Sequence, residues 1–370
     1  SRLQKMILSL APSRTGAGFL SLIASCVAQQ DVSQLVEPIG LKYNLPAITA
    51  AVVDDQKILA QGVTGVRKAG EKEKATLEDL WHLGSETKAI TATLAGTFVA
   101  DGSLKWSDPV TVHFPEFSNR IHESLRNVTV ADLLSHRAGL TPNLKWGEFG
   151  TRNLSRERLK VVKELLTSPP ASPVGSYAYS NAGYVVVGAI LEKLGKKPWE
   201  DLLRERVFAP LGMKQTGFGG TGTPGKIDQP WPHFESGLPV AENGPTTDNP
   251  PVMGPAGTCH ATIHSWALFL SDQLRGAAGR KALFPTSIYD EIQSPHPKDS
   301  TYGFGWGVGR RPWAGGKVLT HTGSNTMNFA VCWLAPVKGF GILVCTNQAG
   351  DNASKAADEA VAALIAWRNK

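Results

Sequence analysis

The sequence predicts an α/β fold in which an antiparallel sheet, made by both ends of the chain and flanked by helices, carries an inserted, mostly helical region. Short apolar segments of strand character occur near residues 47–63 and return at 317–346. Between them, apolar residues recur at helical spacing in several places. Strands at both ends favour one sheet assembled from distant parts of the chain. The 370 residues suffice for one large domain or two interlocked ones.

The N-terminal elements follow from periodicity and turn residues. Val, Leu and Ile recur at helical spacing over residues 32–43, and Asp54-Asp55 marks the turn of a β-hairpin. Apolar residues share one face of the next helix, and Gly102 is its stop signal. The expected elements are a helix at 32–43, strands at 47–53 and 57–63, and a helix at 85–100.

The middle of the chain is mainly helical and loop-like, and strands return before a closing helix. The clearest helices span 130–134, 158–166, 183–194 and 199–207. The later strands span 317–322, 329–334 and 341–346, and the closing helix spans 353–367. Residues 221–257 are rich in Pro and Gly and lack periodicity, so they predict a long loop at the rim of a site.

These elements divide the chain into two parts. Residues 31–104 and 296–370 are assigned to an α/β domain, and residues 105–295 to a helical domain with long loops. Because substrate sites form in the clefts where such parts meet, an active site is expected at the boundary between them.

The N-terminal segment, residues 1–30, has the features of a secretory leader. Lys5 and Arg14 precede an apolar run at 19–28 that is too short for a comfortable membrane span, and polar residues follow. The residues before Cys26 also resemble a bacterial lipoprotein cleavage box, which would acylate Cys26 and attach the protein to a membrane. The alternative is a buried N-terminal helix. We therefore expect an exported protein, periplasmic or extracellular.

Charge and cysteine usage exclude several classes of protein. The net charge of +6 is only mildly basic, and no basic stripe with interleaved aromatic residues occurs, which argues against a nucleic-acid partner. Four cysteines are too few for a disulfide framework. Cys332 and Cys345 lie on neighbouring predicted strands in a register that does not place them opposite each other. With Cys259, they are expected to be buried free thiols.

Ser85 and Lys88 are the first candidates for chemistry. Three residues apart at the start of a helix, they share one helical face, so the amine can reach the hydroxyl. An alcohol is a poor nucleophile unless a base takes its proton, and a lysine can do so when burial or nearby cations lower its pKa. The helix start adds free backbone N–H groups. The pattern alone fits an exposed N-cap serine with a solvated lysine equally well.

Two further motifs favour the catalytic interpretation of Ser85 and Lys88 over the exposed N-cap serine. In Tyr179-Ser180-Asn181, between a turn and a helix, the phenol can relay a proton and the amide can hold a substrate or orient a lysine. His321-Thr322-Gly323, followed by Ser324, ends a predicted strand, where Gly lets a substrate approach closely and a backbone N–H can face a developing oxyanion. In isolation, a packed core tyrosine and a surface histidine explain these motifs equally well.

Taken together and in this order, the three motifs resemble those of the serine β-lactamase and penicillin-binding protein superfamily, specifically its class C-like branch. Further similar stretches are LLSHRAGL at 133–140, PLGM at 210–213, PAG at 255–257 and the YGFGW strand at 302–306. Ala138 replaces the usual Ser of the first, and Thr258 replaces the second Gly of the third. The resemblance covers about residues 32–367 and implies a β-lactamase-like fold without metal or cofactor.

The resemblance also implies a role for each site residue. Ser85 is the expected acylated nucleophile, Lys88 its base and Tyr179 the proton shuttle. The remaining assignments are Asn181, Asn143, His321 and Thr322 as substrate-binding residues, and the backbone N–H groups of Ser85 and Ser324 as the oxyanion hole. Asn143 is placed there because it stands where the family has a Gln that contacts the acyl side chain.

His321 narrows the class of substrate that we expect the site to bind. Class C β-lactamases usually carry Lys there, whereas His is similar to class C-like DD-carboxypeptidases, D-aminopeptidases and esterases. A histidine is mostly uncharged at neutral pH, so binding of a substrate carboxylate should be weaker or pH-dependent. We expect a serine hydrolase that acts through an acyl-enzyme on small esters or D-amino-acid peptides. The alternatives are a class C-like β-lactamase acting on β-lactams and an inert penicillin-binding or peptidoglycan-binding module.

Competing kinds of site receive less support. The chain has no GxSxG, so the nucleophile elbow of α/β-hydrolases is absent. His260 and His264 have the spacing of a zinc pair, but no Glu stands next to His260. Capping or packing is the favoured explanation of both histidines.

Overall fold

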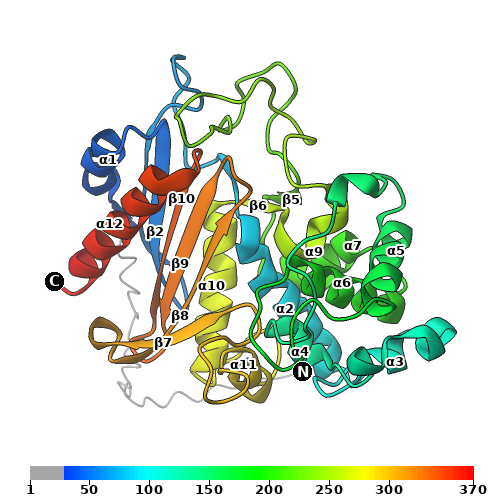
Figure 1. Cartoon of the computed structure of the whole chain (residues 1–370). Helices are drawn as coiled ribbons and strands as arrows, with labels where there is room; N and C mark the ends of the chain where they lie inside the picture. Colours follow the sequence, from blue (N-terminus) through cyan, green and yellow to red (C-terminus); the bar gives the residue numbers. More distant parts are fainter. Residues whose placement is uncertain (1–28) are drawn as a thin grey trace, which may run out of the picture.

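Both ends of the chain contribute to one seven-stranded sheet in the computed structural model, which describes residues 29–370. Its strands are β1 (Gln30–Asp31), β2 (Ala47–Asp54), β3 (Ile58–Gly65), β7 (Gly307–Arg311), β8 (Gly316–Ser324), β9 (Phe329–Ala335) and β10 (Phe340–Thr346). The order across the sheet is β1-β3-β2-β10-β9-β8-β7, so β10 lies between β2 and β9 (Figure 1). All neighbours are antiparallel except β1 and β3, which are parallel.

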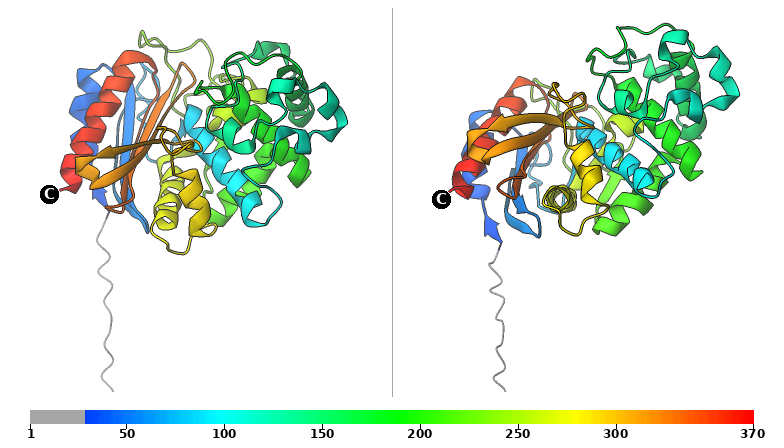
Figure 2. Two further views of the ribbon diagram at one scale, coloured as in Figure 1. Left: turned by 60° about the horizontal axis from the view of Figure 1, so that its bottom comes forward. Right: turned by 90° about the horizontal axis from the view of Figure 1, so that it is seen from below.

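Both faces of the sheet are covered. Successive strand residues point to opposite faces, and in β2 Ala50 belongs to one hydrophobic cluster and Ala51 to the other. The first cluster is completed by helices α1 (Ser33–Lys42) and α12 (Gly350–Arg368). The second includes α10 (Ile263–Ala277), which packs against β2 and β10. Figure 2 shows α1 and α12 on one side of the sheet and the other helices on the opposite side.

The helical part lies between the early and late strands of the sequence. Its helices are α3 (Val110–His113), α4 (Val130–Leu134), α5 (Leu154–Leu166), α6 (Asn181–Gly195), α7 (Trp199–Leu203), α8 (Ala209–Leu211), α9 (Gly254–Gly257) and α11 (Thr286–Ile292). Shorter helical turns are η1 (Gly84–Glu86), η2 (Pro115–Arg120), η3 (Glu123–Leu125), η4 (Trp146–Glu148), η5 (Arg204–Phe208), η6 (Pro251–Met253) and η7 (Pro312–Ala314).

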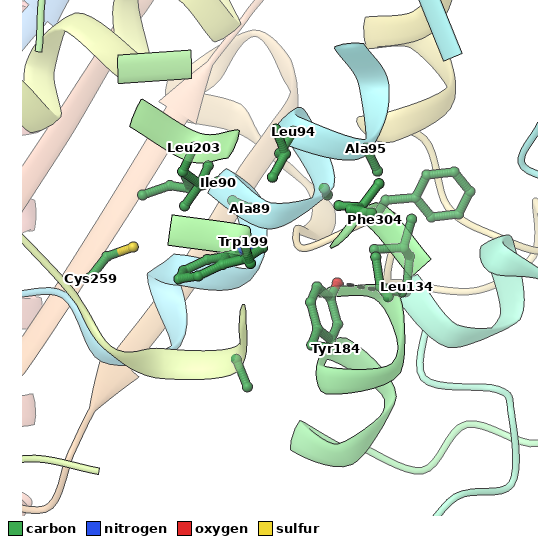
Figure 3. Packing of buried hydrophobic residues seen from close by; sticks show 14 of the residues in the cluster. Ala89, Ile90, Leu94, Ala95, Leu134, Tyr184, Trp199, Leu203, Cys259 and Phe304 are labelled. Atoms are coloured by element: carbon green, nitrogen blue, oxygen red, sulfur yellow. Dashed lines mark hydrogen bonds between the residues drawn. The ribbon is translucent and has the colours of Figure 1, made fainter. Parts of the chain in front are cut away.

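Helix α2 (Thr87–Ala100) lies between the sheet and the helical part and is buried on almost every side. Its sequence is small and apolar all round, which is typical of a helix in the interior of a protein. Figure 3 shows Ile90 and Leu94 of α2 in the same cluster as Tyr184 and Trp199 from the helical part. Ser85 and Lys88 stand at the start of this helix.

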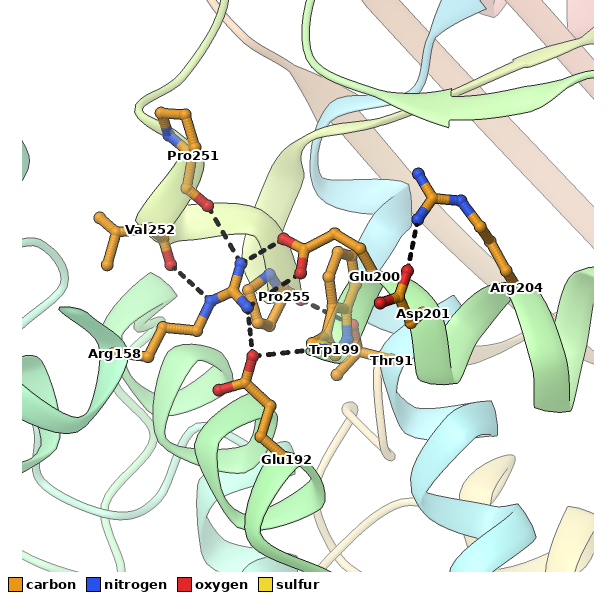
Figure 4. A network of polar contacts seen from close by, with 10 residues as sticks. All are labelled: Thr91, Arg158, Glu192, Trp199, Glu200, Asp201, Arg204, Pro251, Val252 and Pro255. Atoms are coloured by element: carbon orange, nitrogen blue, oxygen red, sulfur yellow. Dashed lines mark hydrogen bonds and ion pairs between the residues drawn. The ribbon is translucent and has the colours of Figure 1, made fainter. Parts of the chain in front are cut away.

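Arg158 of α5 joins three segments of the helical part. Its guanidinium is fully buried and pairs with Glu192 of α6 and Glu200 of α7. It also donates hydrogen bonds to the carbonyls of Pro251 and Val252, which precede α9 (Figure 4). A buried charge is tolerated only when it is paired and hydrogen-bonded, and this one is both. The network therefore fixes the segment that leads into α9.

A second, smaller sheet joins β4 (Leu80–His82), β5 (Thr216–Phe218) and β6 (Cys259–Thr262) in the order β4-β6-β5. Both of its pairings are antiparallel. The three strands are too short for periodicity to reveal them, and the sequence did not predict this sheet. It brings the residues before Ser85 against the residues that follow α9.

The predicted α/β class, with an antiparallel sheet from both chain ends and flanking helices, is confirmed. Strand β7 was not predicted, and the segment at 302–306, expected as a strand, has only a single bridge at Tyr302. Residues 219–250 contain no named helix or strand, as expected for the long loop, but helical turns occupy 251–257. Periodicity cannot reveal helical turns this short.

Some predictions are not tested by this structure. The predicted leader lies outside the described residues except for its last two, and Cys26 lies outside them as well. The division of the chain at residues 105 and 295 stays a prediction. Across residues 29–370, no helix combines the length and apolar character needed to cross a membrane.

The three cysteines of the described chain are buried and free, as predicted. In the β9–β10 pairing, Cys332 lies opposite Leu343, and Cys345 lies opposite Ala330. The predicted register, in which the two cysteines are not paired, is therefore confirmed.

Candidate active site

Ser85 lies in η1, one residue before α2, and its side chain is partly exposed. Lys88 is in the first turn of α2 and is fully buried. Its Nζ lies 2.9 Å from the Oγ of Ser85, which confirms that the three-residue spacing brings the two groups together. Nζ also lies 2.7 Å from the Oδ1 of Asn181 and 2.7 Å from the carbonyl oxygen of Ala256.

The burial of Lys88 favours the uncharged amine. Burial lowers the pKa of Lys88 well below its usual value. A neutral amine has two N–H bonds and one lone pair, whereas Asn181 Oδ1 and the Ala256 carbonyl can only accept. The two N–H groups therefore donate to these acceptors, and the lone pair is left for the hydroxyl proton of Ser85. This is the arrangement that a general base requires.

Tyr179 and Asn181 are placed by the start of α6. Ser180 is the N-cap: its Oγ accepts a hydrogen bond from the backbone N–H of Gly183 at 3.0 Å. The backbone N–H of Ser180 donates in turn to Nδ1 of His136 at 3.0 Å. The cap fixes the backbone on either side of Ser180, so the phenol and the amide both face Lys88.

The Tyr179 phenol is neutral in this environment. Burial raises its pKa above the usual value, and a hydrogen bond with Ser85 only partly offsets this. Its ring lies 4.3 Å from that of His136, and the Lys88 Nζ lies 4.8 Å from its centroid. The phenol is therefore suited to pass on a proton rather than to act as a phenolate base.

Asn181 and Asn143 form a chain of amides that leads away from Lys88. Because Oδ1 of Asn181 accepts from Lys88, its Nδ2 is free to donate, and it does so to Oδ1 of Asn143 at 2.9 Å. The same Asn143 oxygen accepts from Nε1 of Trp146 at 3.1 Å. Its own Nδ2 has no partner within residues 29–370, and Asn143 is exposed. The structure thus places Asn143 beside the other predicted site residues.

His321 on β8 is nine-tenths buried, with both ring nitrogens engaged. Nε2 lies 2.9 Å from the hydroxyl of Tyr302, and Nδ1 lies 2.6 Å from the carbonyl oxygen of Thr322. Burial and the nearby Lys88 lower the pKa of His321 to about 3, so the ring is uncharged at neutral pH. With this value, His321 does not titrate near neutral pH.

The backbone N–H groups of Ser85 and Ser324 lie where η1 meets the end of β8. A Cβ on Gly84 would lie 2.3 Å from the Ser324 nitrogen, and a Cβ on Gly323 would lie 2.8 Å from the Ser85 nitrogen. Real Cβ atoms essentially never approach so closely, so only glycine permits this contact. The two predicted oxyanion-hole donors are thereby brought together.

A cavity of about 520 Å³ is lined by three of the predicted site residues, Tyr179, His321 and Thr322, but not by Ser85 or Lys88. Its lining also includes Trp333 of β9 and Lys355 of α12. Most of its exposed lining is apolar, so it can accommodate the part of a substrate that lies beyond the reacting carbonyl.

All the predicted site residues meet in one place. Three further groups, for which no role was predicted, also belong to this site. They are the Tyr302 hydroxyl against His321, the ring of His136 against Tyr179, and the Ala256 carbonyl against Lys88. Each lies in a stretch that the sequence singled out by resemblance, in YGFGW, LLSHRAGL and PAG. The motifs were the available signal, but nothing local indicated that these groups would face the site.

His260 and His264, the two histidines with the spacing of a zinc pair, do not form a metal site. His260 is buried, its Nδ1 lies 2.8 Å from the carbonyl oxygen of Gly219, and burial lowers its pKa to about 4. His264 is exposed at the start of α10. Within residues 29–370, no cluster of three or more His, Cys, Asp or Glu side chains could hold a metal ion.

Comparison with known proteins identifies the family. The model of the Beta-lactamase family matches residues 28–366. The chain belongs to the Beta-lactamase family. Membership confirms the resemblance drawn from the three motifs, and it confirms the predicted enzyme class, serine hydrolase, at the level of the family.

Relatives within and around this family agree with the fold. The chain is 27% identical over 335 residues to an unguisins hydrolase of Aspergillus campestris, covering 86% of this chain and 61% of that protein. It superposes on the octameric penicillin-binding protein homologue of Pyrococcus abyssi with a TM-score of 0.72 at 22% identity, covering 90% and 77% of the two chains. For the D-alanine carboxypeptidase AmpC of Burkholderia cenocepacia the TM-score is 0.69 at 20% identity, covering 90% and 97%. These superpositions confirm the β-lactamase-like fold. The chain spans less than two thirds of the length of the curated relatives it matches, for example 61% of the unguisins hydrolase.

Proposed function

We propose that this member of the Beta-lactamase family is a serine hydrolase that forms an acyl-enzyme on Ser85 and acts on small esters or D-amino-acid peptides. One observation supports this above all. The buried Lys88 amine has a lowered pKa, its two N–H groups have acceptors, and its lone pair is left to the Ser85 hydroxyl at 2.9 Å. An inert binding module would gain nothing from burying an amine in this way.

In the proposed acylation step, Ser85 Oγ forms a bond to the substrate carbonyl carbon while its proton moves to Nζ of Lys88. The carbonyl oxygen becomes an oxyanion and takes hydrogen bonds from the backbone N–H groups of Ser85 and Ser324. When the bond to the leaving group breaks, Tyr179 donates its proton to that group and recovers one from Lys88.

Deacylation reverses these roles. Water attacks the acyl carbon, and its proton passes through Tyr179 to Lys88. The bond between that carbon and Ser85 Oγ breaks, and the serine regains its proton from Lys88. The chain of Asn181 and Asn143 supports a role in holding the substrate, because Asn143 keeps an amide N–H for a carbonyl of the acyl group.

The choice of substrate depends on His321. A β-lactam or C-terminal carboxylate is best bound by a cation, whereas the ring of His321 is neutral and held between Tyr302 and the Thr322 carbonyl. This favours esters, and peptides that present no free carboxylate at this position, over β-lactams. The name of one structural neighbour, a D-alanine carboxypeptidase, and that of one relative, a hydrolase of unguisins, are in keeping with the proposal.

We further propose that the protein is exported, with small esters or peptides as its partners. The leader-like segment at residues 1–30 is the support for this, and acylation of Cys26 would add a membrane anchor. Fractionation of cells that produce the full chain, with mass spectrometry of its N-terminus, tests both points.

Covalent labelling tests the central proposal. The parent protein and a Ser85→Ala variant are treated with a fluorophosphonate, and the adduct is located by peptide mass spectrometry. We expect one adduct on Ser85 in the parent and none in the variant. A Ser118→Ala variant, which changes a half-buried serine of η2, should label like the parent.

A substrate panel then separates the alternatives. We expect hydrolysis of a p-nitrophenyl ester or of an amidated D-Ala-D-Ala peptide to exceed that of a chromogenic cephalosporin. Faster hydrolysis of the cephalosporin would make β-lactamase the better assignment. If Ser85→Ala retained the parent rate on every substrate, the proposed function would be wrong.

A further inference from the structure

A buried contact between a histidine and a carboxylate lies next to η1, the turn that carries the proposed nucleophile. His82 ends β4, and Asp248 lies in the loop before α9. Nε2 of His82 is 2.7 Å from Oδ1 of Asp248, and neither side chain is more than 2% exposed. A carboxylate is rarely buried so completely unless its position serves a purpose, because removing it from water is costly. No motif of the sequence predicted this pair.

His82 fixes the backbone on the N-terminal side of Ser85. Its Nδ1 accepts a hydrogen bond from the backbone N–H of Gly84 at 3.0 Å, within the protein interior. Gly84 has φ near +50°, a left-handed conformation in which glycine is at ease. The conformation of Gly84 sets the direction of the next peptide group, whose N–H belongs to Ser85. His82 therefore acts on the first oxyanion-hole donor.

Asp248 fixes the second donor through Asn325. Its Oδ1 also accepts a hydrogen bond from Nδ2 of Asn325 at 2.9 Å. The Oδ1 of Asn325 accepts from the backbone N–H groups of Met327 at 3.3 Å and Asn328 at 3.0 Å, so its side chain holds the turn that follows β8. Ser324, the residue before Asn325, carries the second donor. One carboxylate oxygen thus connects the backbones on both sides of the oxyanion hole.

The loop that contains Asp248 also contacts α9, which carries the carbonyl group beside Lys88. Nδ2 of the next residue, Asn249, donates to the carbonyl of Gly257 at 2.8 Å. The preceding carbonyl, that of Ala256, accepts from Lys88. One short loop therefore holds η1, the end of β8 and α9, which between them present every backbone group of the proposed site.

The pair is not a second acid/base system. A histidine that activates a serine must have one ring nitrogen directed to the hydroxyl and the other directed to a carboxylate. In His82, Nδ1 is taken by the backbone of Gly84 and Nε2 faces Asp248. No ring nitrogen remains for Ser85, whose hydroxyl proton has Lys88 as its acceptor.

We propose that His82, Asp248 and Asn325 form a positioning clamp that sets the spacing of the two oxyanion-hole N–H groups. The inference rests on the proposed function, because an oxyanion forms only if Ser85 attacks a carbonyl. None of the three side chains contacts the substrate, so they are positioning residues. Donors stabilise an oxyanion only at about 2.7–3.1 Å, so a small displacement of either N–H reduces the rate without removing Ser85 or Lys88.

Two variants, Asp248→Asn and Asn325→Ala, each weaken contacts within the clamp. The control is Asp272→Asn on α10, an equally buried carboxylate whose partners are Tyr289, Arg275 and the backbone N–H of Leu283. For each protein we would measure kcat and KM on a p-nitrophenyl ester, the thermal midpoint, and the infrared carbonyl stretch of the acyl-enzyme on Ser85. The carbonyl stretch reports hydrogen bonding to the acyl oxygen, and a purely structural role would not change it.

Both clamp variants should lose about tenfold to a hundredfold in kcat while KM changes less than about threefold. Their acyl carbonyl band should move to higher frequency, because the oxygen receives weaker hydrogen bonds. Asp272→Asn should lower the thermal midpoint yet keep the parent kcat and band.

If Asp248→Asn fails to fold, Asn325→Ala answers the question alone, since it changes only one contact of the carboxylate. Parent values of kcat and of the carbonyl band in a folded clamp variant would overturn the clamp while leaving the proposed function intact. Absence of an acyl adduct on the parent would overturn both.

Discussion

The pKa of Lys88 is lowered by burial, and this places the residue at the centre of both stability and chemistry. Between that lowered pKa and the usual 10.5, the unfolded chain binds a proton that the folded chain does not. The fold is therefore destabilised as pH falls through this window. The same shift favours the free amine, which is the form that the proposed mechanism requires of its base. In that mechanism, stability is given up in return for reactivity.

The pH profile tests this assignment. Labelling of Ser85 by a fluorophosphonate should keep its full rate at neutral pH and fall in acid, as Lys88 takes up a proton. A Lys88→Arg variant, whose guanidinium does not release a proton, should label about 10²–10⁴-fold more slowly. A rate that rises only near the ordinary lysine pKa would show that Lys88 is charged at neutral pH. His321 should add no step between pH 5 and 8, since its pKa is about 3.

Single residues also show which contacts could not be predicted from the sequence. Ser85 and Lys88 could be paired from their spacing, because a helix alone brings them together. Glu86, between them, is 1% exposed and accepts hydrogen bonds from the backbone and thiol of Cys332, and burial raises its pKa well above the usual range. Its sequence neighbours give no sign of this. A contact between residues 246 positions apart depends on the whole fold.

At the scale of elements, the site depends on the contact between η1 and β8. This contact is made by two glycines, Gly84 and Gly323, and a Cβ on Gly323 would lie 1.9 Å from the carbonyl oxygen of Leu83. Backbone atoms cannot yield as a flexible side chain can. The motif His321-Thr322-Gly323 therefore has a glycine at its end for a steric reason that the sequence did not reveal.

A Gly323→Ala substitution should separate η1 from β8 and lower kcat/KM at least about a hundredfold, because both oxyanion-hole donors move. The matched control is Gly309→Ala on β7, where a Cβ would meet Val318 at an ordinary 3.6 Å. The control should keep the activity of the parent. Steady-state kinetics with circular dichroism on both variants makes the comparison. Equal activity of the two alanine variants would contradict the proposed importance of this contact.

The elements themselves were predicted unevenly, and the physical reason is length. Most of the long helices and the hairpin strands were predicted, because several turns or pleats carry a periodic signal, although the 15-residue α10 was not. The sheet of β4, β5 and β6 could not, because strands of three or four residues have no period to detect. This small sheet is what brings His82 to the back of the site.

At the scale of the whole molecule, the helical part is held together by a buried charge. Arg158→Met would leave Glu192 and Glu200 buried without their partner, which should reduce the free energy of unfolding by about 3–5 kcal/mol. The control, Lys160→Ala, removes a half-exposed lysine from its pair with Glu157 and should cost about 0–1 kcal/mol. Urea unfolding measures both variants.

Folded Arg158→Met should still label at Ser85 but more slowly than the parent, because the network fixes the segment that leads into α9, whose Ala256 carbonyl accepts from Lys88. Loss of labelling in proportion to the remaining folded fraction is expected on heating. A variant as stable as the parent would show that the ion pairs only offset the energy needed to bury them.

The order of strands in the large sheet has a consequence for how the protein is made. Translation delivers β2 and β3 early, but the inner edge of β2 has no partner until β10 leaves the ribosome, and Ala50 pairs with Val344. Until then a growing chain carries an open, apolar strand edge that favours aggregation. The oxyanion-hole donor on β8 is also delivered late. We expect chains that end before β10 to keep this edge open and to aggregate, whereas the full chain closes it.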